Sequence, residues 1–240
     1  MSGPVTGAES AFRPAHGQSS DDPHRDSPSV RLGPDLQEAE AAVILVHGRG
    51  DSARGILTLA PDLDAPRVTF IAPQATAFSW YPQSFLAPIP MNEPWLSSAL
   101  DRVGAAVREA MSTGLPRKKT VLMGFSQGAC LALEFAARNP DRYGGVVAFS
   151  GGLIGPEGTP LSYEGFLEGT PVFLGCSDVD PHVSLARVNE SAGIMEALGG
   201  QVEERIYPGM GHTVNTDELE WARMLLNDLN AARPTSSTGL

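Results

Sequence analysis

Residues 120–130 constrain the fold of this 240-residue chain more than any other stretch. Residues 121–123, Val-Leu-Met, form an apolar run, which is the pattern of a strand buried on both faces. Gly-Phe-Ser-Gln-Gly follows at 124–128, and a helix-like segment at 129–138 is stopped by Pro140, because proline has no N–H to donate. The stretch therefore predicts a strand, a tight turn and a helix in direct succession.

Ser126, at the centre of this turn, is a predicted nucleophile. A serine between two glycines, after a strand and before a helix, is typical of a nucleophile elbow. Side chains at Gly124 and Gly128 would collide with neighbouring backbone in so tight a turn. The serine, held in a strained conformation, would project its hydroxyl clear of the sheet. The alternative is a glycine-rich turn with an idle serine.

The composition narrows the class of protein. The length suits one α/β domain with a sizeable core. A net charge of −11 argues against nucleic-acid binding, which requires basic patches. Cys130 and Cys176 are the only two cysteines, so we expect buried thiols in a reducing, cytoplasmic compartment and not a disulfide framework.

The domain boundaries are expected near residues 28 and 232. Residues 1–28 are rich in Ser, Pro, Gly, Asp and His, a composition that predicts a flexible N-terminal tail. Residues 233–240 are expected to form a disordered C-terminal tail, and 29–232 the folded domain. The N-terminus lacks the apolar segment of a secretory signal, and no stretch is long enough for a membrane span.

Strand-like and helix-like segments alternate along the domain, which predicts an α/β fold with a mostly parallel central sheet and helices on both faces. Ligands in such sheets bind beyond the carboxyl ends of the strands. The expected strands are 30–32, 41–46, 68–72, 121–123, 145–150, 172–176 and 202–207, and the expected helices 52–59, 95–111, 129–138, 185–198 and one opening at Thr216.

A serine nucleophile needs a base, and the base needs an orienting acid. His212, in a glycine-rich loop after the last strand, is the predicted base, whereas His47 is expected to pack. His16 and His24 are set aside as tail residues. The order Ser, acid, His along the chain is that of the α/β-hydrolase fold.

Two aspartates, Asp178 and Asp180, compete for the role of the acid. Asp180 is favoured because it stands at the loop tip, where Pro181 fixes the chain immediately after it. Asp178 is then explained as a turn residue whose carboxylate bonds to nearby backbone N–H groups.

The oxyanion of a tetrahedral intermediate needs two N–H donors. We expect them to be the backbone amides of Gln127, directly after the nucleophile, and of Arg49, between Gly48 and Gly50. Two roles are open for the Arg49 side chain: it binds an acidic group on the substrate, or it forms an ion pair with Asp51.

An aromatic-rich segment at 73–94 completes the predicted site. Trp80, Tyr81, Phe85 and Met91, together with His182, are expected to bind substrate. The alternatives are that these aromatics pack a homodimer interface and that His182 is an exposed polar residue.

Four motifs resemble the phospholipase/carboxylesterase family of α/β hydrolases, which includes small bacterial carboxylesterases and acyl-protein thioesterases. They lie at 45–51, 124–128, 178–183 and 211–212. The resemblance implies Ser126, Asp180 and His212 as a catalytic triad, with the Arg49 and Gln127 amides as oxyanion donors.

The chain departs from that family's pattern in three places. Arg49 stands where a hydrophobic residue is frequent, Ala129 replaces a frequent third glycine, and the segment from Trp80 to Phe85 is unlike that of the thioesterases. These departures argue against long-acyl or lipidated-protein substrates.

The predicted activity is hydrolysis of small carboxylic esters by a cofactor-free, metal-free serine carboxylesterase, through an acyl-enzyme. A thioesterase or lysophospholipase on the same triad is the nearest alternative, because oxyester and thioester attack require the same groups. A peptidase and a non-catalytic ligand-binding protein on the same fold are the others.

Overall fold

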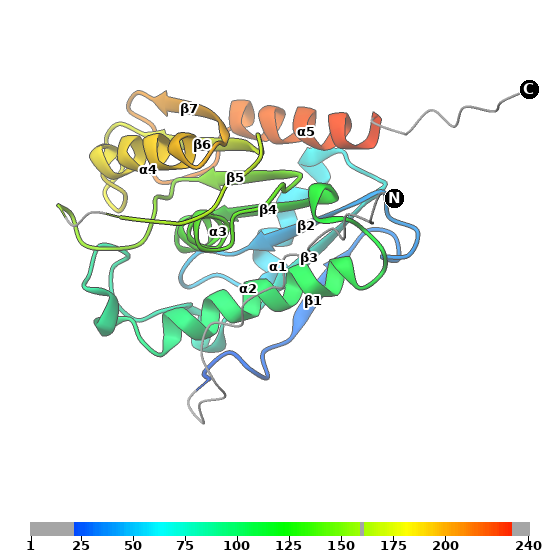
Figure 1. The fold of residues 1–240 in the computed structure, drawn as a ribbon, viewed down its shortest axis with the longest axis horizontal. Helices are drawn as coiled ribbons and strands as arrows, with labels where there is room; N and C mark the ends of the chain where they lie inside the picture. Colours follow the sequence, from blue (N-terminus) through cyan, green and yellow to red (C-terminus); the bar gives the residue numbers. More distant parts are fainter. Residues whose placement is uncertain (1–21, 159–160, 232–240) are drawn as a thin grey trace, which may run out of the picture.

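A seven-stranded sheet crosses the computed structural model, which describes residues 22–158 and 161–231 (Figure 1). The strand order is β1-β3-β2-β4-β5-β6-β7, and all neighbouring pairs are parallel except β1 with β3. The prediction of a mostly parallel α/β sheet is therefore confirmed. The strands are β1 (Ser29–Leu32), β2 (Ala41–Val46), β3 (Val68–Pro73), β4 (Thr120–Phe125), β5 (Gly145–Phe149), β6 (Pro171–Ser177) and β7 (Gln201–Tyr207).

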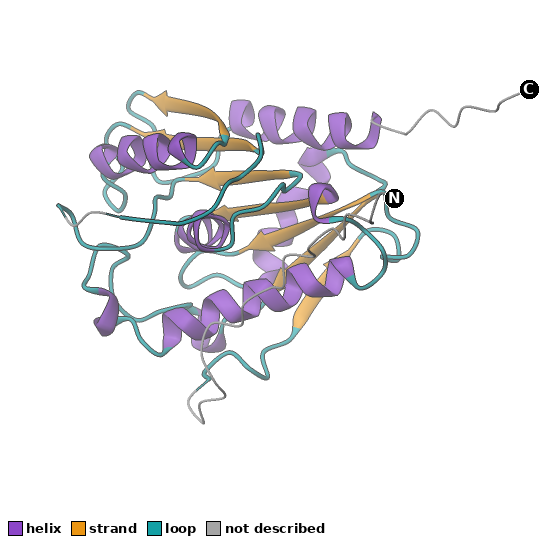
Figure 2. Cartoon of the chain, viewed as in Figure 1, coloured by secondary structure: helices purple, strands orange, loops and turns teal. Residues whose placement is uncertain are grey.

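Helices cover both faces of the sheet (Figure 2). The helices α2 (Trp95–Met111), α3 (Gln127–Arg138) and α4 (Leu185–Ala197) pack on one face. The other face carries α1 (Ala53–Ile56), the 3₁₀ segment η1 (Leu57–Leu63) and α5 (Thr216–Ala231). Side chains of β2 alternate between the two cores, so a strand with no polar residue supplies both layers.

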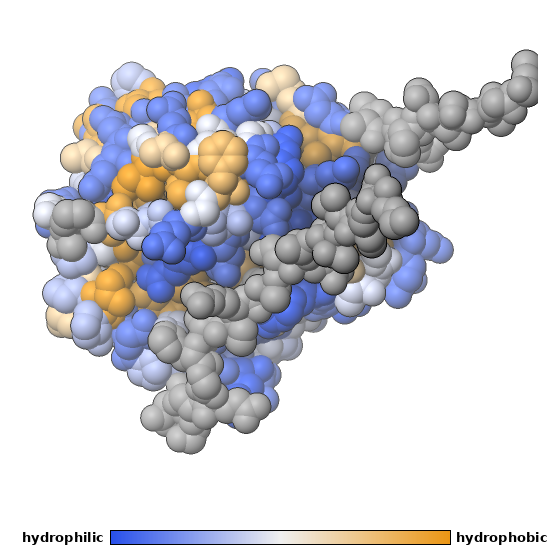
Figure 3. Space-filling view, in the orientation of Figure 1, coloured by the Kyte–Doolittle hydropathy of each residue, from blue (hydrophilic) through white to orange (hydrophobic). Residues whose placement is uncertain are grey.

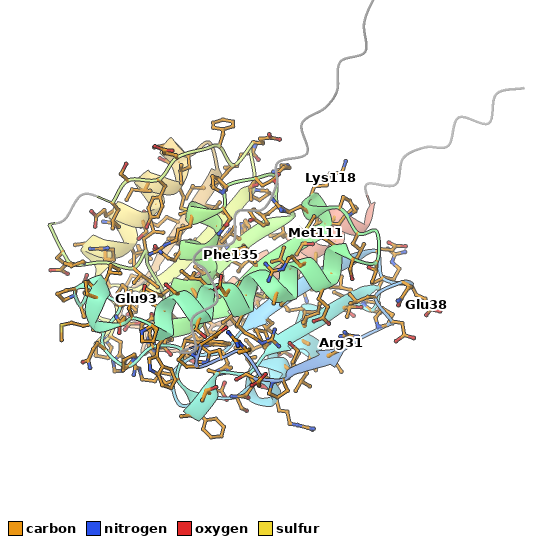
Figure 4. All side chains as sticks on the ribbon, turned by 60° about the horizontal axis from the view of Figure 1, so that its bottom comes forward. Arg31, Glu38, Glu93, Met111, Lys118 and Phe135 are labelled. Carbon is orange, nitrogen blue, oxygen red and sulfur yellow. The ribbon has the colours of Figure 1, made fainter. Side chains whose placement is uncertain are left out.

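The long helix α2 is fixed at both ends, which Figure 4 marks with Glu93 and Met111. Near its start, the Glu93 carboxylate accepts hydrogen bonds from the Ser97 amide at 3.1 Å and the Ser97 hydroxyl at 2.9 Å. Near its end, Glu109 forms an ion pair with Arg31 of β1. The helix thereby ties the edge strand to the rest of the sheet.

The helix expected at 52–59 is shorter than predicted. Its α-helical part ends at Ile56, and the chain continues as the 3₁₀ segment η1, which contains Pro61. Proline removes a backbone donor and disfavours α-helical geometry in the preceding residue.

The predicted tail boundary is wrong for residues 22–28, while 1–21 and 232–240 lie outside the described residues. His24 has no exposed surface. Its Nε2 donates to the Trp80 carbonyl at 2.9 Å, and its Nδ1 accepts from the Thr76 amide at 3.1 Å. These tertiary bonds order a segment whose own composition favours disorder.

Apolar side chains lie mainly inside the described part of the molecule. On the face in Figure 3, hydrophilic residues are interspersed with smaller hydrophobic areas. No helix in residues 22–158 or 161–231 has the length and apolar composition to cross a bilayer.

Candidate active site

Ser126 occupies a sharp turn between β4 and α3. Its backbone has φ 55° and ψ −119°, and its amide donates to the Phe149 carbonyl at 2.9 Å. A Cβ at Gly124 would lie 2.4 Å from the Gly128 backbone, and one at Gly128 would lie 2.1 Å from the Val46 carbonyl oxygen. Only glycine fits at both positions, and the strained serine between them has the conformation expected of an elbow.

Three side chains from three loops meet at this turn. Ser126 Oγ lies 2.8 Å from Nε2 of His212, which follows β7, and His212 Nδ1 lies 2.6 Å from Oδ2 of Asp180, which follows β6. Because the aspartate accepts the Nδ1 proton, Nε2 is free to accept a proton from the serine. The structure thus brings together the three residues that the sequence analysis selected.

The Asp180 side chain is fully buried. Its Oδ1 accepts from the amides of His182 at 2.8 Å and Val183 at 3.1 Å. Burial works to raise the pKa of Asp180, but the hydrogen bonds from His212 and from these two amides outweigh it and lower the pKa overall. Asp180 therefore stays ionised beneath the imidazole.

Asp178 has a different position. It is exposed, and its Oδ1 accepts from the Gly209 amide at 2.8 Å. Its carboxylate does bond to a backbone N–H group, as expected. The partner is not in its own turn, however, but in the loop that carries His212. Asp178 thus joins the two loops that carry Asp180 and His212.

The His212 loop is also held where it enters α5. Asn215 and Glu218 form reciprocal bonds: the Asn215 amide donates to Glu218 Oε2 at 2.8 Å, and the Glu218 amide donates to Asn215 Oδ1 at 3.0 Å. This is a capping box, and the spacing of Asn215 and Glu218 in the sequence would have revealed it. Glu218 was expected only as an acidic residue in the first turn of this helix, and its pairing with Asn215 was not predicted.

The loop after β2 lies against the elbow. A Cβ at Gly48 would lie 3.4 Å from Phe125 and from the Ser126 Cβ. Arg49 follows directly, and Gln127 is the first residue of α3, where backbone N–H groups are free of intrahelical partners. Both predicted oxyanion donors therefore belong to segments that border Ser126.

Among the described residues, the Arg49 side chain forms no ion pair with Asp51 or with another acidic residue. Its guanidinium donates to the carbonyls of Pro82 at 2.9 Å and Gln83 at 2.6 Å, and lies 6.0 Å from the Tyr81 ring centroid. Arg49 thus fastens the loop after β2 to the aromatic segment.

Trp80 is not a substrate-contacting residue, and its assignment to the pocket is wrong. It is fully buried, and its indole N–H donates to the His47 carbonyl at 2.9 Å. Its amide donates to Gln127 Oε1 at 2.9 Å, and Gln127 Nε2 donates to the Tyr81 carbonyl at 2.9 Å. Trp80 therefore braces the segments on both sides of Ser126 from behind.

His47 packs as expected. Its Nδ1 donates to the Gly48 carbonyl at 2.7 Å and its Nε2 accepts from the Ala75 amide at 3.1 Å, so the ring is neutral. Burial lowers its pKa, with the hydrogen bond to Gly48 acting in the opposite direction.

A cavity of about 480 Å³ opens at Ser126. Tyr81, Phe85 and His182 line it as predicted, whereas Met91 is exposed and outside its lining, so that assignment is also wrong. Met91 ends a short 3₁₀ turn, η3 (Ile89–Met91), which points it to solvent. The residues that line the cavity are Gly48, Arg49, Asp51, Tyr81, Pro82, Gln83, Ser84, Phe85, Phe125, Ser126, Gln127, Cys130, His182, Val183 and His212.

Tyr81 and Phe85 are buried within their own chain, so a dimer is not required to cover them. Cys130, which also lines the cavity, was missed as a site residue. Its place four residues after Ser126 on a helix would have indicated it. Among the described residues, no group of three or more His, Cys, Asp or Glu side chains is placed to hold a metal ion.

Comparison with known proteins agrees with this geometry. The phospholipase/carboxylesterase family model matches residues 32–230. The chain belongs to this family. It is therefore a hydrolase, and its fold is that of the α/β-hydrolase carboxylesterases.

Individual relatives cover most of the chain. A phospholipase/carboxylesterase from Dyadobacter fermentans is 42% identical, with a TM-score of 0.80, over 84% of this chain and 96% of that one. Esterase PE8 is 26% identical, with a TM-score of 0.70, over 85% and 99%. Acyl-protein thioesterase 1 of Debaryomyces hansenii is 27% identical over 84% of this chain and 97% of its own.

Proposed function

We propose that this family member is a serine carboxylesterase that hydrolyses small carboxylic esters through an acyl-enzyme. The observation that carries the proposal is the continuous hydrogen-bonded series from Ser126 Oγ through His212 to Asp180, at 2.8 and 2.6 Å, at the edge of a cavity of about 480 Å³. A cavity of this size is within the range of small-molecule sites.

In the first half-reaction, Ser126 Oγ attacks the ester carbonyl while His212 Nε2 accepts the hydroxyl proton. Asp180 stabilises the resulting imidazolium through its buried carboxylate. The amides of Arg49 and Gln127 donate to the oxyanion of the tetrahedral intermediate. The C–O bond to the alcohol then breaks, and His212 returns its proton to the leaving oxygen.

In the second half-reaction, water attacks the acyl-enzyme carbonyl and gives a proton to His212. The second intermediate collapses, the carboxylic acid leaves, and Ser126 Oγ regains its proton. The two half-reactions balance in protons with these side chains and one water molecule.

The decisive experiment combines a fluorophosphonate probe with Ser126→Ala. We expect the probe to label Ser126, as located by mass spectrometry, and ester hydrolysis to be abolished in a folded Ser126→Ala variant. Retained hydrolysis in that variant would overturn the proposal. Absence of label on a well-folded wild-type protein would favour the ligand-binding alternative.

A thioesterase is the second function to test, since relatives at 26–27% identity bear the name acyl-protein thioesterase 1. A panel of p-nitrophenyl esters and acyl-thioesters of matched chain length separates the two. A steady rise in kcat/KM beyond about eight carbons, or a consistent preference for thioesters, would contradict the small-ester proposal.

A further inference from the structure

The inner end of the cavity lies one helical turn beyond the nucleophile. Cys130 follows Ser126 by four residues in α3, a rise of about 6 Å along the helix axis. Cys130 and Tyr81 both line the cavity, yet each is only 1% exposed. We refer to these two almost fully buried lining residues as the floor of the cavity.

The hydroxyl group of Tyr81 is buried, and no nitrogen or oxygen atom of the described residues is its hydrogen-bond partner; its polar neighbour is the Cys130 thiol. Two other tyrosines, the buried Tyr143 and the half-buried Tyr163, are satisfied: the Tyr143 hydroxyl donates to the Asn139 carbonyl at 2.7 Å, and the Tyr163 hydroxyl donates to Glu134 Oε2 at 2.9 Å. Buried hydroxyl groups in folded proteins nearly always have a partner. The Tyr81 hydroxyl is therefore a donor without a nitrogen or oxygen acceptor at the buried side of the cavity that Tyr81 lines.

The walls around this donor are mainly apolar. Phe85 and Val183 line the same cavity, and the Phe85 carbonyl accepts from the Gly155 amide at 2.9 Å, which fixes Phe85 in place. The Cys130 thiol beside the Tyr81 hydroxyl is held neutral, because burial raises its pKa to about 12. A thiol is at most a weak hydrogen-bond partner.

A neutral ligand group suits the floor better than an anionic one, because a buried charge is costly. The Glu134 carboxylate lies on the same side of α3 as Cys130 and is already bonded to the Ile154 amide at 2.9 Å, to Tyr163 and, as an ion pair, to Arg138. The Arg49 guanidinium is bonded to two backbone carbonyls. A carboxylate at the floor would lose its hydration among apolar walls, whereas a neutral oxygen costs less to bury and needs only one donor.

The leaving alcohol and the acyl chain take different directions from Ser126. His212 must return a proton to the leaving oxygen, so the alcohol faces His212 and the neighbouring His182 ring, whose centroids are 4.8 Å apart. The floor formed by Cys130 and Tyr81 is then left for the acyl chain.

We propose that Tyr81 determines acyl specificity: its hydroxyl donates to a neutral oxygen on a short acyl chain. The preferred substrates are then esters of short oxo-, hydroxy- or alkoxy-acids, and simple alkanoate esters are poorer substrates. This inference rests on the proposed esterase function and defines its substrate class.

The test compares p-nitrophenyl 4-oxopentanoate with p-nitrophenyl pentanoate, two esters of similar shape that differ by one carbonyl oxygen. We expect wild-type kcat/KM for the oxo ester to exceed that for the alkyl ester by about tenfold or more, after correction for their rates of alkaline hydrolysis. In Tyr81→Phe, which keeps the ring and removes only the hydroxyl, the ratio falls to near one.

Tyr143→Phe is the matched control, because it removes a hydroxyl from a buried tyrosine outside the cavity lining and leaves the ratio at its wild-type value. Tyr81→Phe deletes an unpaired buried hydroxyl, so its melting temperature is expected to be no lower than that of the wild type. A corrected wild-type ratio near one, or a ratio unchanged in Tyr81→Phe, would overturn the inference while the esterase function stands. Cleavage of neither ester would overturn both.

Discussion

Glu218→Gln removes a buried negative charge while it preserves the shape of the side chain and an acceptor for the Asn215 amide. Glu218 is fully buried, and one of its carboxylate oxygens, Oε1, has no partner among the described residues. Burial raises the pKa of Glu218 to about 7; the hydrogen bond from the Asn215 amide opposes this, and the charge of Asp217 adds to it. The ordinary value is about 4.3.

The sign of the effect follows from proton binding. Because the pKa is raised in the folded state, the stability that Glu218 contributes is fully present below its unfolded pKa and is lost as the pH rises through about 7. Each pKa unit corresponds to 1.36 kcal/mol, so the loss between pH 5 and pH 8 is about 2 to 3 kcal/mol. Glutamine does not ionise and loses nothing over this range.

Urea unfolding at pH 5 and pH 8 measures this difference. We expect the free energy of unfolding of Glu218→Gln, relative to the wild type, to rise by about 2 to 3 kcal/mol from pH 5 to pH 8. Glu220→Gln on the same helix, at a side chain 55% exposed, is the control and should show the same offset at both pH values within about 0.5 kcal/mol. An offset for Glu218→Gln that is equally independent of pH would refute the reasoning.

Two further predictions concern the catalytic acid and the ordered N-terminal segment. Asp180→Asn should lower kcat by about 10³- to 10⁴-fold, because an uncharged amide no longer stabilises the His212 imidazolium. Asp178→Asn should lower kcat less than about tenfold. Equal effects of the two variants in steady-state assays would contradict the proposal that Asp180 is the acid. His24→Ala should destabilise the fold by about 3 to 5 kcal/mol in urea, since it leaves the Trp80 carbonyl and Thr76 amide without partners and opens a cavity. Burial lowers the pKa of His24, so the stability that this residue contributes is present above about pH 6.5 and is lost as the pH falls. His24→Ala should therefore lose less stability than the wild type between pH 7 and pH 5. An equal loss in the two proteins would contradict this pH dependence.

The sequence predicted the sheet and the meeting of Ser126, Asp180 and His212 because both depend on local patterns. Each buried strand is a short apolar run, and the carboxyl ends of parallel strands meet at one edge, which brings the residues after β4, β6 and β7 together. Pro181 and the glycine-rich loop around His212 were sufficient to select Asp180 and His212.

The rest depended on contacts that no local pattern encodes. His24 lies in a polar segment, and the partners that bury it are more than 50 residues away in sequence. The aromatic content of residues 73–94 predicted side chains at the substrate site, which fits the place of Tyr81 in the cavity lining, but it did not reveal that Trp80 faces inward. The partners of the Arg49 guanidinium are backbone carbonyls, which side-chain identity does not reveal.

The Gln127 side chain has a consequence for how this enzyme can be altered. Its amide group bonds to the backbone of Trp80 and Tyr81, so the residue beside Ser126 also sets the position of the aromatic wall of the cavity. An engineer who grafts a different aromatic segment to change selectivity also changes the support of the chain at Gln127, one of the two proposed oxyanion donors. Recombination between relatives should therefore succeed only when this segment and the start of α3 are inherited together.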